Sequence, residues 1–235
     1  MKILINLIAV CALAIAPQAI AALDSIRVDT STAQPQMPLP LLTHGVTEGR
    51  VVVVVDVNAE GKMTDHLIVG YTHEQLVKPI VEALKEWQYQ PARRDGVPVP
   101  AQIELTVNLS ATGVVVSMTS SDVVDAYLER IMGDRLKYRP SHPNEIDRVP
   151  VRTNTVAPKY AEQALKEGVR GKVQVHFYID ENGVARMPAI DRTDHPYLAE
   201  IAVAAVREWK FEPPTAKGHP VMVEASQEFD FGKGG

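Results

Sequence analysis

The chain has 235 residues, of which 46% are hydrophobic and 23% charged, and its formal net charge is -5 at pH 7. This composition supports one or two small folded domains and excludes an intrinsically disordered chain. The negative charge provides no basic field that would attract nucleic acid, so we expect no nucleic-acid partner.

Residues 1–21 have the pattern of a secretory signal peptide. Lys2 precedes an apolar run from Ile3 to Ala16, and Ala19-Ile20-Ala21 offers small residues for cleavage. We therefore expect an exported protein. The alternative is an uncleaved anchor in contact with the inner membrane, because the apolar run with its flanks approaches the ~20 residues that span a bilayer.

The single cysteine, Cys11, lies inside this apolar run. The mature chain is therefore expected to have no thiol for catalysis, disulfides or metal binding. Residues 22–40 are polar and rich in proline, which favours an extended lead-in over a packed element.

The first structured unit is expected over residues 41–118. Valines alternate through 49–57 and predict a strand, and 62–69 forms the returning strand after a turn that ends at Gly61. Helical spacing over 75–87 predicts a helix that ends at Trp87. A third strand follows over 100–109.

The same order recurs at a constant offset of 122 positions. Gly49 to Leu109 aligns on Gly171 to Phe231 without a gap, and the conserved pairs are Gly61 and Gly183, Trp87 and Trp209, and Gly96 and Gly218. Two copies of one unit indicate a tandem duplication. Between them, residues 119–150 form a linker with an amphipathic helix over 121–134, and the second copy spans 151–235.

The second copy resembles the TonB C-terminal domain family. The resemblance is carried by Pro158-x-Tyr160, the Gly171 strand with Asp180-x-x-Gly183, Trp209-x-Phe211-x-Pro213 and Gly218-x-Pro220-Val221. The first copy is a looser match, without the Pro-x-Tyr helix that precedes the domain. The resemblance implies an α+β fold, in which each copy is a small antiparallel sheet with helices packed on one side.

The resemblance also implies a binding role, in which a segment of an outer-membrane receptor or another envelope protein adds as a strand to the sheet edge. Such pairing uses backbone groups and needs no cofactor or catalytic side chain. The candidate acceptor is the last strand, Val221 to Phe231, whose acidic outward side chains favour a ligand with positive charge. The predicted partner-binding residues are Val221, Val223, Glu224, Ser226, Glu228 and Asp230.

Enzymatic alternatives begin with His73 and His195, which are equivalent in the repeat, with Asp194 beside the second. We interpret both histidines as positions that precede a helix, because no further ligand recurs at a suitable spacing. Asp180-x-Asn182-Gly183 resembles the start of a calcium loop but lacks the downstream glutamate, so a hairpin turn explains it better. We expect neither a metal nor an enzyme.

Two contrasts between the copies generate structural hypotheses. The first strand of copy 1 carries Val52 and Val54 on its outer face, so that face needs a cover, either the 121–134 helix or the second copy. Gly113 to Met118 is expected to fold back as an extra strand, with Leu105 near Val115, and to occupy the edge of copy 1. Copy 1 would then be structural and copy 2 the acceptor.

The sequence thus predicts a periplasmic interaction module linked to outer-membrane transport. A membrane-anchored TonB-like transducer and a structural, dimerising envelope protein remain the alternatives. The anchored transducer is disfavoured, since residues 22–40 reach only about 60 Å at ~3.1 Å per residue.

Trp209, Phe211, Gly183 and Trp87 are expected to form the structural core around each helix end. We predict that Trp209→Ala lowers the free energy of unfolding by roughly 3 to 5 kcal/mol, because the indole leaves a large cavity. Thermal denaturation measures this loss, and an unchanged midpoint would contradict a core role for Trp209.

Overall fold

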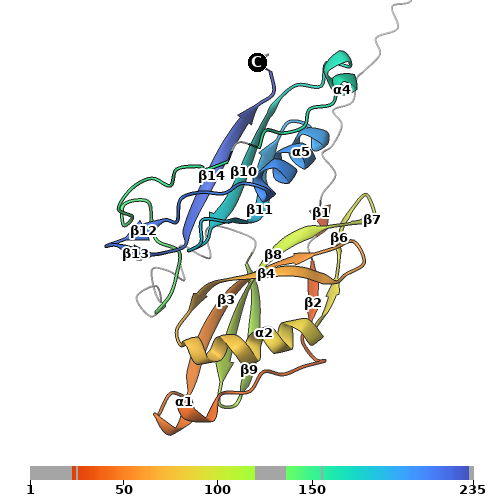
Figure 1. The fold of residues 1–235 in the computed structure, drawn as a ribbon. Coiled ribbons are helices and arrows are strands. Elements are labelled where there is room, and N and C mark those ends of the chain that lie inside the picture. The colour runs from red at the N-terminus through yellow and green to blue at the C-terminus, as the bar shows by residue number, and fades with distance from the viewer. Residues whose placement is uncertain (1–22, 25, 120–135, 155, 233–235) are drawn as a thin grey trace, which may run out of the picture.

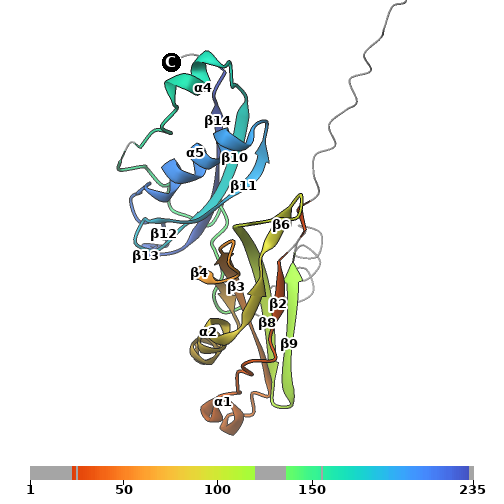
Figure 2. The same ribbon diagram turned by 90° about the vertical axis from the view of Figure 1, so that its right-hand side faces the viewer.

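The computed structural model describes residues 23–24, 26–119, 136–154 and 156–232. In this part of the chain, two units of sheet and helix follow each other, and both views show the second copy above the first (Figures 1 and 2). The α+β fold predicted from the sequence is confirmed. The predicted signal peptide and the 121–134 helix lie outside the described residues.

The first copy is built on a four-stranded antiparallel sheet in the order β4-β3-β8-β9. The helix predicted over 75–87 is a short 3-10 turn followed by α2, whose apolar side packs on the inner face of the sheet. The elements are β3 (Glu48–Val57), β4 (Met63–Tyr71), η1 (Glu74–Leu76), α2 (Val77–Glu86), β8 (Ala101–Ser110) and β9 (Gly113–Thr119).

The second copy has a three-stranded antiparallel sheet in the order β11-β10-β14, with α5 packed mainly on β11 and β10. A short hairpin, β12 (Thr215–Ala216) and β13 (His219–Pro220), connects helix and last strand. The main elements are α4 (Glu162–Lys166), β10 (Lys172–Ile179), β11 (Ala185–Thr193), α5 (Pro196–Arg207) and β14 (Val223–Asp230).

Both copies close their first hairpin with the same turn chemistry. Asn58 Oδ1 accepts from the amides of Glu60 and Lys62, and Asp180 Oδ1 accepts from those of Asn182 and Val184. The hairpin interpretation of Asp180-x-Asn182-Gly183 is therefore confirmed. Side chains that bond their own turn in this way are favoured between strands.

The lead-in is packed, which corrects the expectation that it would be a loose spacer. β2 (Arg27–Asp29) pairs with β5 (Gln88–Gln90), and β1 (Leu23–Asp24) pairs with β6 (Ala92–Arg94), which in turn pairs with β7 (Val97–Val99). Ile26 between them is only 3% exposed. Backbone pairing needs no particular side chain, so the polar, proline-rich composition did not indicate it.

The lead-in is also held by the tryptophan of the first copy, and the second copy repeats the arrangement. Trp87 Nε1 donates to the carbonyl of Ala33 at 2.6 Å, and Trp209 Nε1 donates to that of Val156 at 2.8 Å. Each buried indole N–H thus finds the partner that burial requires. The repeat unit therefore begins before residue 41.

The first copy also has a short leading helix, which the alignment of the two copies at an offset of 122 positions did not reveal. α1 (Leu39–Thr43) ends in a backbone bond from Val46 N to Leu41 O, and α4 has the matching bond from Val169 N to Ala164 O. The two bonds are offset by 123 positions, whereas the gap-free alignment has an offset of 122. A gap of one residue therefore lies between this segment and the rest of the repeat. Pro35 and Met37 then match Pro158 and Tyr160, and methionine in place of tyrosine hid the motif.

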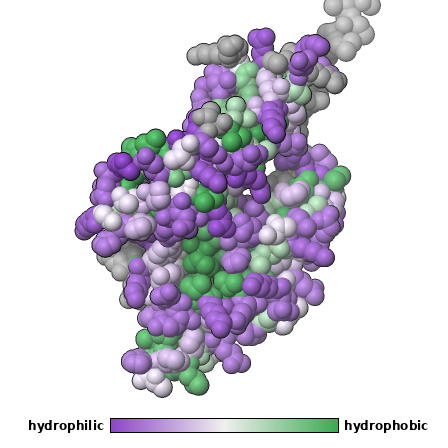
Figure 3. All heavy atoms as spheres, viewed as in Figure 1, coloured by the Kyte–Doolittle hydropathy of each residue, from purple (hydrophilic) through white to green (hydrophobic). Residues whose placement is uncertain are grey.

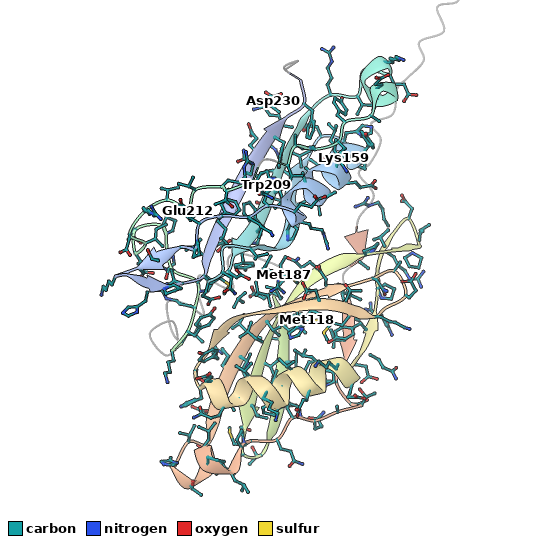
Figure 4. All side chains as sticks on the ribbon, in the orientation of Figure 1. Met118, Lys159, Met187, Trp209, Glu212 and Asp230 are labelled. Atoms are coloured by element: carbon teal, nitrogen blue, oxygen red, sulfur yellow. The ribbon has the colours of Figure 1, made fainter. Side chains whose placement is uncertain are left out.

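The outer face of the first sheet is covered by the second copy, which is one of the two covers expected. Val54, 3% exposed, packs in one cluster with Tyr178, Met187 and Met222 of the second copy. Figure 4 shows Met187 at the junction of the two copies. The register shift of β11 opposite Phe177 and a positive φ of 50° at Met187 bring this side chain to the junction.

Ion pairs border this apolar junction. Arg186 Nη2 lies 3.1 Å from Asp65 Oδ1 and also donates to the carbonyl of His66. Arg207 Nη2 lies 3.5 Å from Asp56 Oδ2, whose side chain is only 14% exposed. Each pair joins one copy to the other, so the copies dock in a defined orientation.

Gly183 and Gly218 allow a matched test of close packing at the hairpin. Both have positive φ, 78° and 77°, but a Cβ on Gly183 would collide with the Phe211 carbonyl, whereas a Cβ on Gly218 meets nothing within 4 Å. We expect Gly218→Ala to cost about 1 to 2 kcal/mol from left-handed strain. Gly183→Ala should cost a further 1 to 3 kcal/mol or so from overpacking.

Chemical denaturation of both variants measures the difference. Equal losses of stability would show that the second sheet relaxes around the added methyl group.

Candidate functional site

The candidate site is the free edge of the second sheet, formed by β14. This strand pairs antiparallel with β10 over its whole length, from Val223 opposite Ile179 to Asp230 opposite Lys172. On its other side, no strand pairs with it over 224–230 among the residues that the structure describes. Figure 1 shows β14 at the outer edge of the upper sheet.

Side chains alternate along β14 as the sequence predicted. Glu224, Ser226, Glu228 and Asp230 are exposed on the outer face, and Figure 4 shows Asp230 towards the far end of the strand. The two valines differ from this pattern. Val223 is 3% exposed and belongs to the core, and Val221 precedes the strand, where its amide donates to the carbonyl of Pro214.

The beginning of this edge is occupied by the linker. Ser141 N donates to Met222 O at 2.8 Å, and Ser141 forms a parallel bridge with Val223. The edge available to another strand therefore begins at Glu224. Sequence reasoning missed this contact, because 139–150 has no periodicity and a single backbone bond leaves no side-chain signal.

The same linker also pairs with the first copy, so we call residues 137–141 the strap. Tyr71 N donates to Tyr138 O at 3.2 Å, the amides of Lys137 and Tyr138 donate back to Tyr71 O, and the two tyrosine rings stack with centroids 5.0 Å apart. The Tyr138 hydroxyl donates to Glu181. Burial and then this hydrogen bond raise the pKa of Tyr138, so its hydroxyl stays protonated.

Charges on the outer face are partly paired. Lys172 Nζ lies 2.8 Å from Glu228 Oε1, and this hydrogen bond raises the pKa of Lys172. His176, on the outer face of β10 as expected, lies between the second copy's Asp191 at 3.8 Å and Glu224 at 3.5 Å. Asp230 accepts a backbone hydrogen bond from Gly232 and lies opposite Lys172 in the strand register.

Phe229, on the inner face of β14, belongs to a row of aromatic rings from several segments of the second copy. Phe229 lies 5.6 Å from Trp209 and 6.1 Å from Phe231 between ring centroids, and Phe231 lies 5.6 Å from Tyr160. Trp209 is 3% exposed, whereas Phe229, Phe231 and Tyr160 are half-buried. Phe211 is also half-buried and packs against Phe177 and Trp209.

The edge strands of the first sheet are β9 and β4. β9 pairs with β8 along one edge, so the extra strand is confirmed, but its register differs from the expected one: Leu105 lies opposite Met118, and Val115 lies opposite Asn108. At the other edge, the strap pairs with Tyr71 and Arg186 bonds the His66 carbonyl.

Between α2 and β4 the first copy has a groove of about 690 Å³, which is lined in part by Tyr138 of the strap. Figure 3 shows apolar residues gathered in this part of the face. Its apolar lining includes Ile68, Val77 and Val81, and its rim carries both acidic and basic side chains. Charges of both signs give the groove no clear ligand preference.

The histidines considered for catalysis occupy helix N-cap positions. His195 caps α5, where Nδ1 accepts from the amide of Tyr197 at 3.2 Å, and His73 precedes the 3-10 turn of the first copy with its Nδ1 3.1 Å from Thr72 Oγ1. Within the described residues, no three histidine, cysteine or acidic side chains group as metal ligands.

The fold is a duplicated α+β module whose second sheet exposes β14 at its edge. The chain belongs to the family described as Gram-negative bacterial TonB protein C-terminal, which matches at residues 44–110 and 156–232. The two matches agree with a tandem duplication. The family consists of non-enzymatic interaction domains of the bacterial envelope.

A search of curated proteins found no match to this chain. Among the helices of the described ranges, none is both long and apolar enough to cross a bilayer.

An ion pair between Arg139 and Glu145 holds the strap, and its contribution to stability depends on pH. Arg139 donates to both carboxylate oxygens of Glu145, and the amide of His142 donates to the same group. These bonds, that of Arg139 first, lower the pKa of Glu145 from 4.5 to about 2. A lowered pKa means that the pair stabilises the fold above pH 4.5 and is lost as the pH falls towards 2.

We expect Arg139→Gln to return the pKa of Glu145 towards 4.5, because its main partner is removed. Carboxyl chemical shifts followed against pH measure this change. Lys166→Gln, which affects only an exposed pair with Glu162, is the control and should leave Glu145 unaffected. An unchanged pKa of Glu145 in Arg139→Gln would show that backbone bonds alone hold this turn.

Proposed function

We propose that the protein is a periplasmic interaction module that binds an extended peptide by adding it as a strand to β14. The observation that carries the proposal is the edge at 224–230. Within the described structure, no strand pairs with its backbone on the side that points away from β10. Unpaired N–H and C=O groups along an exposed edge accept another strand through main-chain bonds.

The two copies have different roles in this proposal. The first copy extends its sheet with β9 at one edge, and the strap and Arg186 contact its other edge strand, β4. It serves as the base on which the second copy docks. The second copy provides the acceptor, because its β14 remains open beyond the strap.

The partner is a segment of an outer-membrane receptor or another envelope protein, and the activity serves outer-membrane transport. Family membership supports this assignment, since domains of this kind interact with outer-membrane receptors. We also propose that residues 1–21 are removed on export and that the mature protein resides in the periplasm. The protein acts without a cofactor and without catalysing a reaction.

Titration of ¹⁵N-labelled protein with peptides from periplasm-facing receptor segments tests the proposal. We expect amide shifts along Glu224–Asp230, because these backbone groups acquire new partners, and none along β9. A peptide N-methylated at alternate residues is the matched control, since it retains its side chains but loses hydrogen bonds on one side. If β14 shows no shifts at millimolar peptide, strand addition at this edge is excluded.

A further inference from the structure

The free edge of β14 borders two chemically different faces of the sheet, the outer face and the inner face. Side chains of an added strand would lie on both faces. Side chains of neighbouring strands lie next to each other on the same face of a sheet. Each face of β14 therefore selects the type of side chain on the matching face of the ligand strand. The structure therefore contains information on the ligand's side chains as well as on its backbone.

The length of the ligand follows from the strap. β14 has eight residues, and the first, Val223, is bridged by Ser141. Seven residues, 224–230, remain for pairing. A ligand strand is therefore seven residues long where it pairs, and a longer segment has to turn away at the strap.

On the outer face, the acidic side chains of this edge outnumber the lysine that faces them. Lys172 forms an ion pair with Glu228 and also lies opposite Asp230, so these two carboxylates share one lysine. Glu224, at the other end, has no ion pair with a lysine or arginine within the described part of the chain. His176 approaches Glu224 only to 3.5 Å and without hydrogen-bond geometry, and its Nε2 makes no hydrogen bond. The outer row is thus acidic at positions six apart.

On the inner face, the aromatic row reaches the same edge. α5 covers mainly β11 and β10, so the inner-face residues of the edge are only partly covered: Ala225 and Phe229 are half-buried, and Gln227 between them is exposed. Apolar side chains of an added strand would bury more of Phe229 and Ala225, which is favourable in proportion to the apolar area removed from water.

The acidic outer row also disfavours a second copy of this chain as the occupant. If β14 paired antiparallel with itself around Gln227, Glu224 would face Asp230 and Ser226 would face Glu228 of the other molecule. Like charges directly opposite each other destabilise a strand pair, and charged side chains are a common protection of sheet edges.

From these contacts we infer that β14 selects a two-faced strand of seven residues, with basic side chains at its two ends on the outer face and apolar side chains at alternate positions on the inner face. The inference rests on the proposed strand addition and specifies the class of peptide that binds.

Three capped seven-residue peptides test the inference on the purified full chain. The first has lysine at both ends, serine at the third and fifth positions and isoleucine at the second, fourth and sixth. The second replaces both lysines with glutamate. The third has the composition of the first, with its three isoleucines contiguous so that the alternation is lost.

At low salt, we expect the lysine peptide to bind about tenfold more tightly than the glutamate peptide, because two cross-strand charge pairs change sign. The double variant Glu224→Gln and Asp230→Asn should abolish this preference. Both residues are exposed, so the fold should be retained. Glu60→Gln, an exposed carboxylate in the hairpin turn of the first copy, is the matched control and should preserve the preference.

Each result distinguishes the inference from the proposed function. Equal binding of the lysine and glutamate peptides, with shifts along β14, overturns the charge selection and leaves strand addition intact. Equal binding of the alternating and contiguous peptides overturns the two-faced ligand. If none of the three peptides shifts β14, both the inference and the proposed acceptor edge fail.

Discussion

Strand β3 is buried on both faces, and the arrangement of the two copies depends on this constraint. Its inner valines pack under α2, and Val54 on its outer face packs against Tyr178, Met187 and Met222 of the second copy. A strand that is apolar on both sides has to be covered on both sides. The second copy provides that cover, so the junction is part of the fold of the first copy.

The docked copies place the edges of the two sheets within reach of one short segment. The strap pairs with Tyr71 of β4 and, three residues later, with the chain just before β14. One piece of irregular chain thereby blocks an edge of the first sheet and shortens the edge of the second. What remains open is the far part of β14, where an exposed and mostly acidic outer row alternates with Ala225, Gln227 and Phe229.

Duplication has therefore led to a division of labour between similar units. Both copies retain the tryptophan that holds its lead-in through an indole N–H bond, and both retain the glycine that lets the hairpin approach the following strand. They differ on the outer face of the first strand, where Val52 and Val54 correspond to Gln174 and His176. The apolar copy became the packing partner, and the polar copy kept its face and one edge in solvent.

The sequence by itself determined the repeat, the order of strands and helices, the hairpin turns and the alternation of β14, because period and turn chemistry are local properties of the chain. It also indicated that the outer face of β3 needs a cover. Only the tertiary structure decided which segment provides that cover, the register of β9, the packing of the lead-in and the position of the strap. Backbone bonds such as Ser141 to Met222 and contacts such as Arg186 to Asp65 join residues far apart in sequence. They leave no periodic signal, and they set the limits of the open edge.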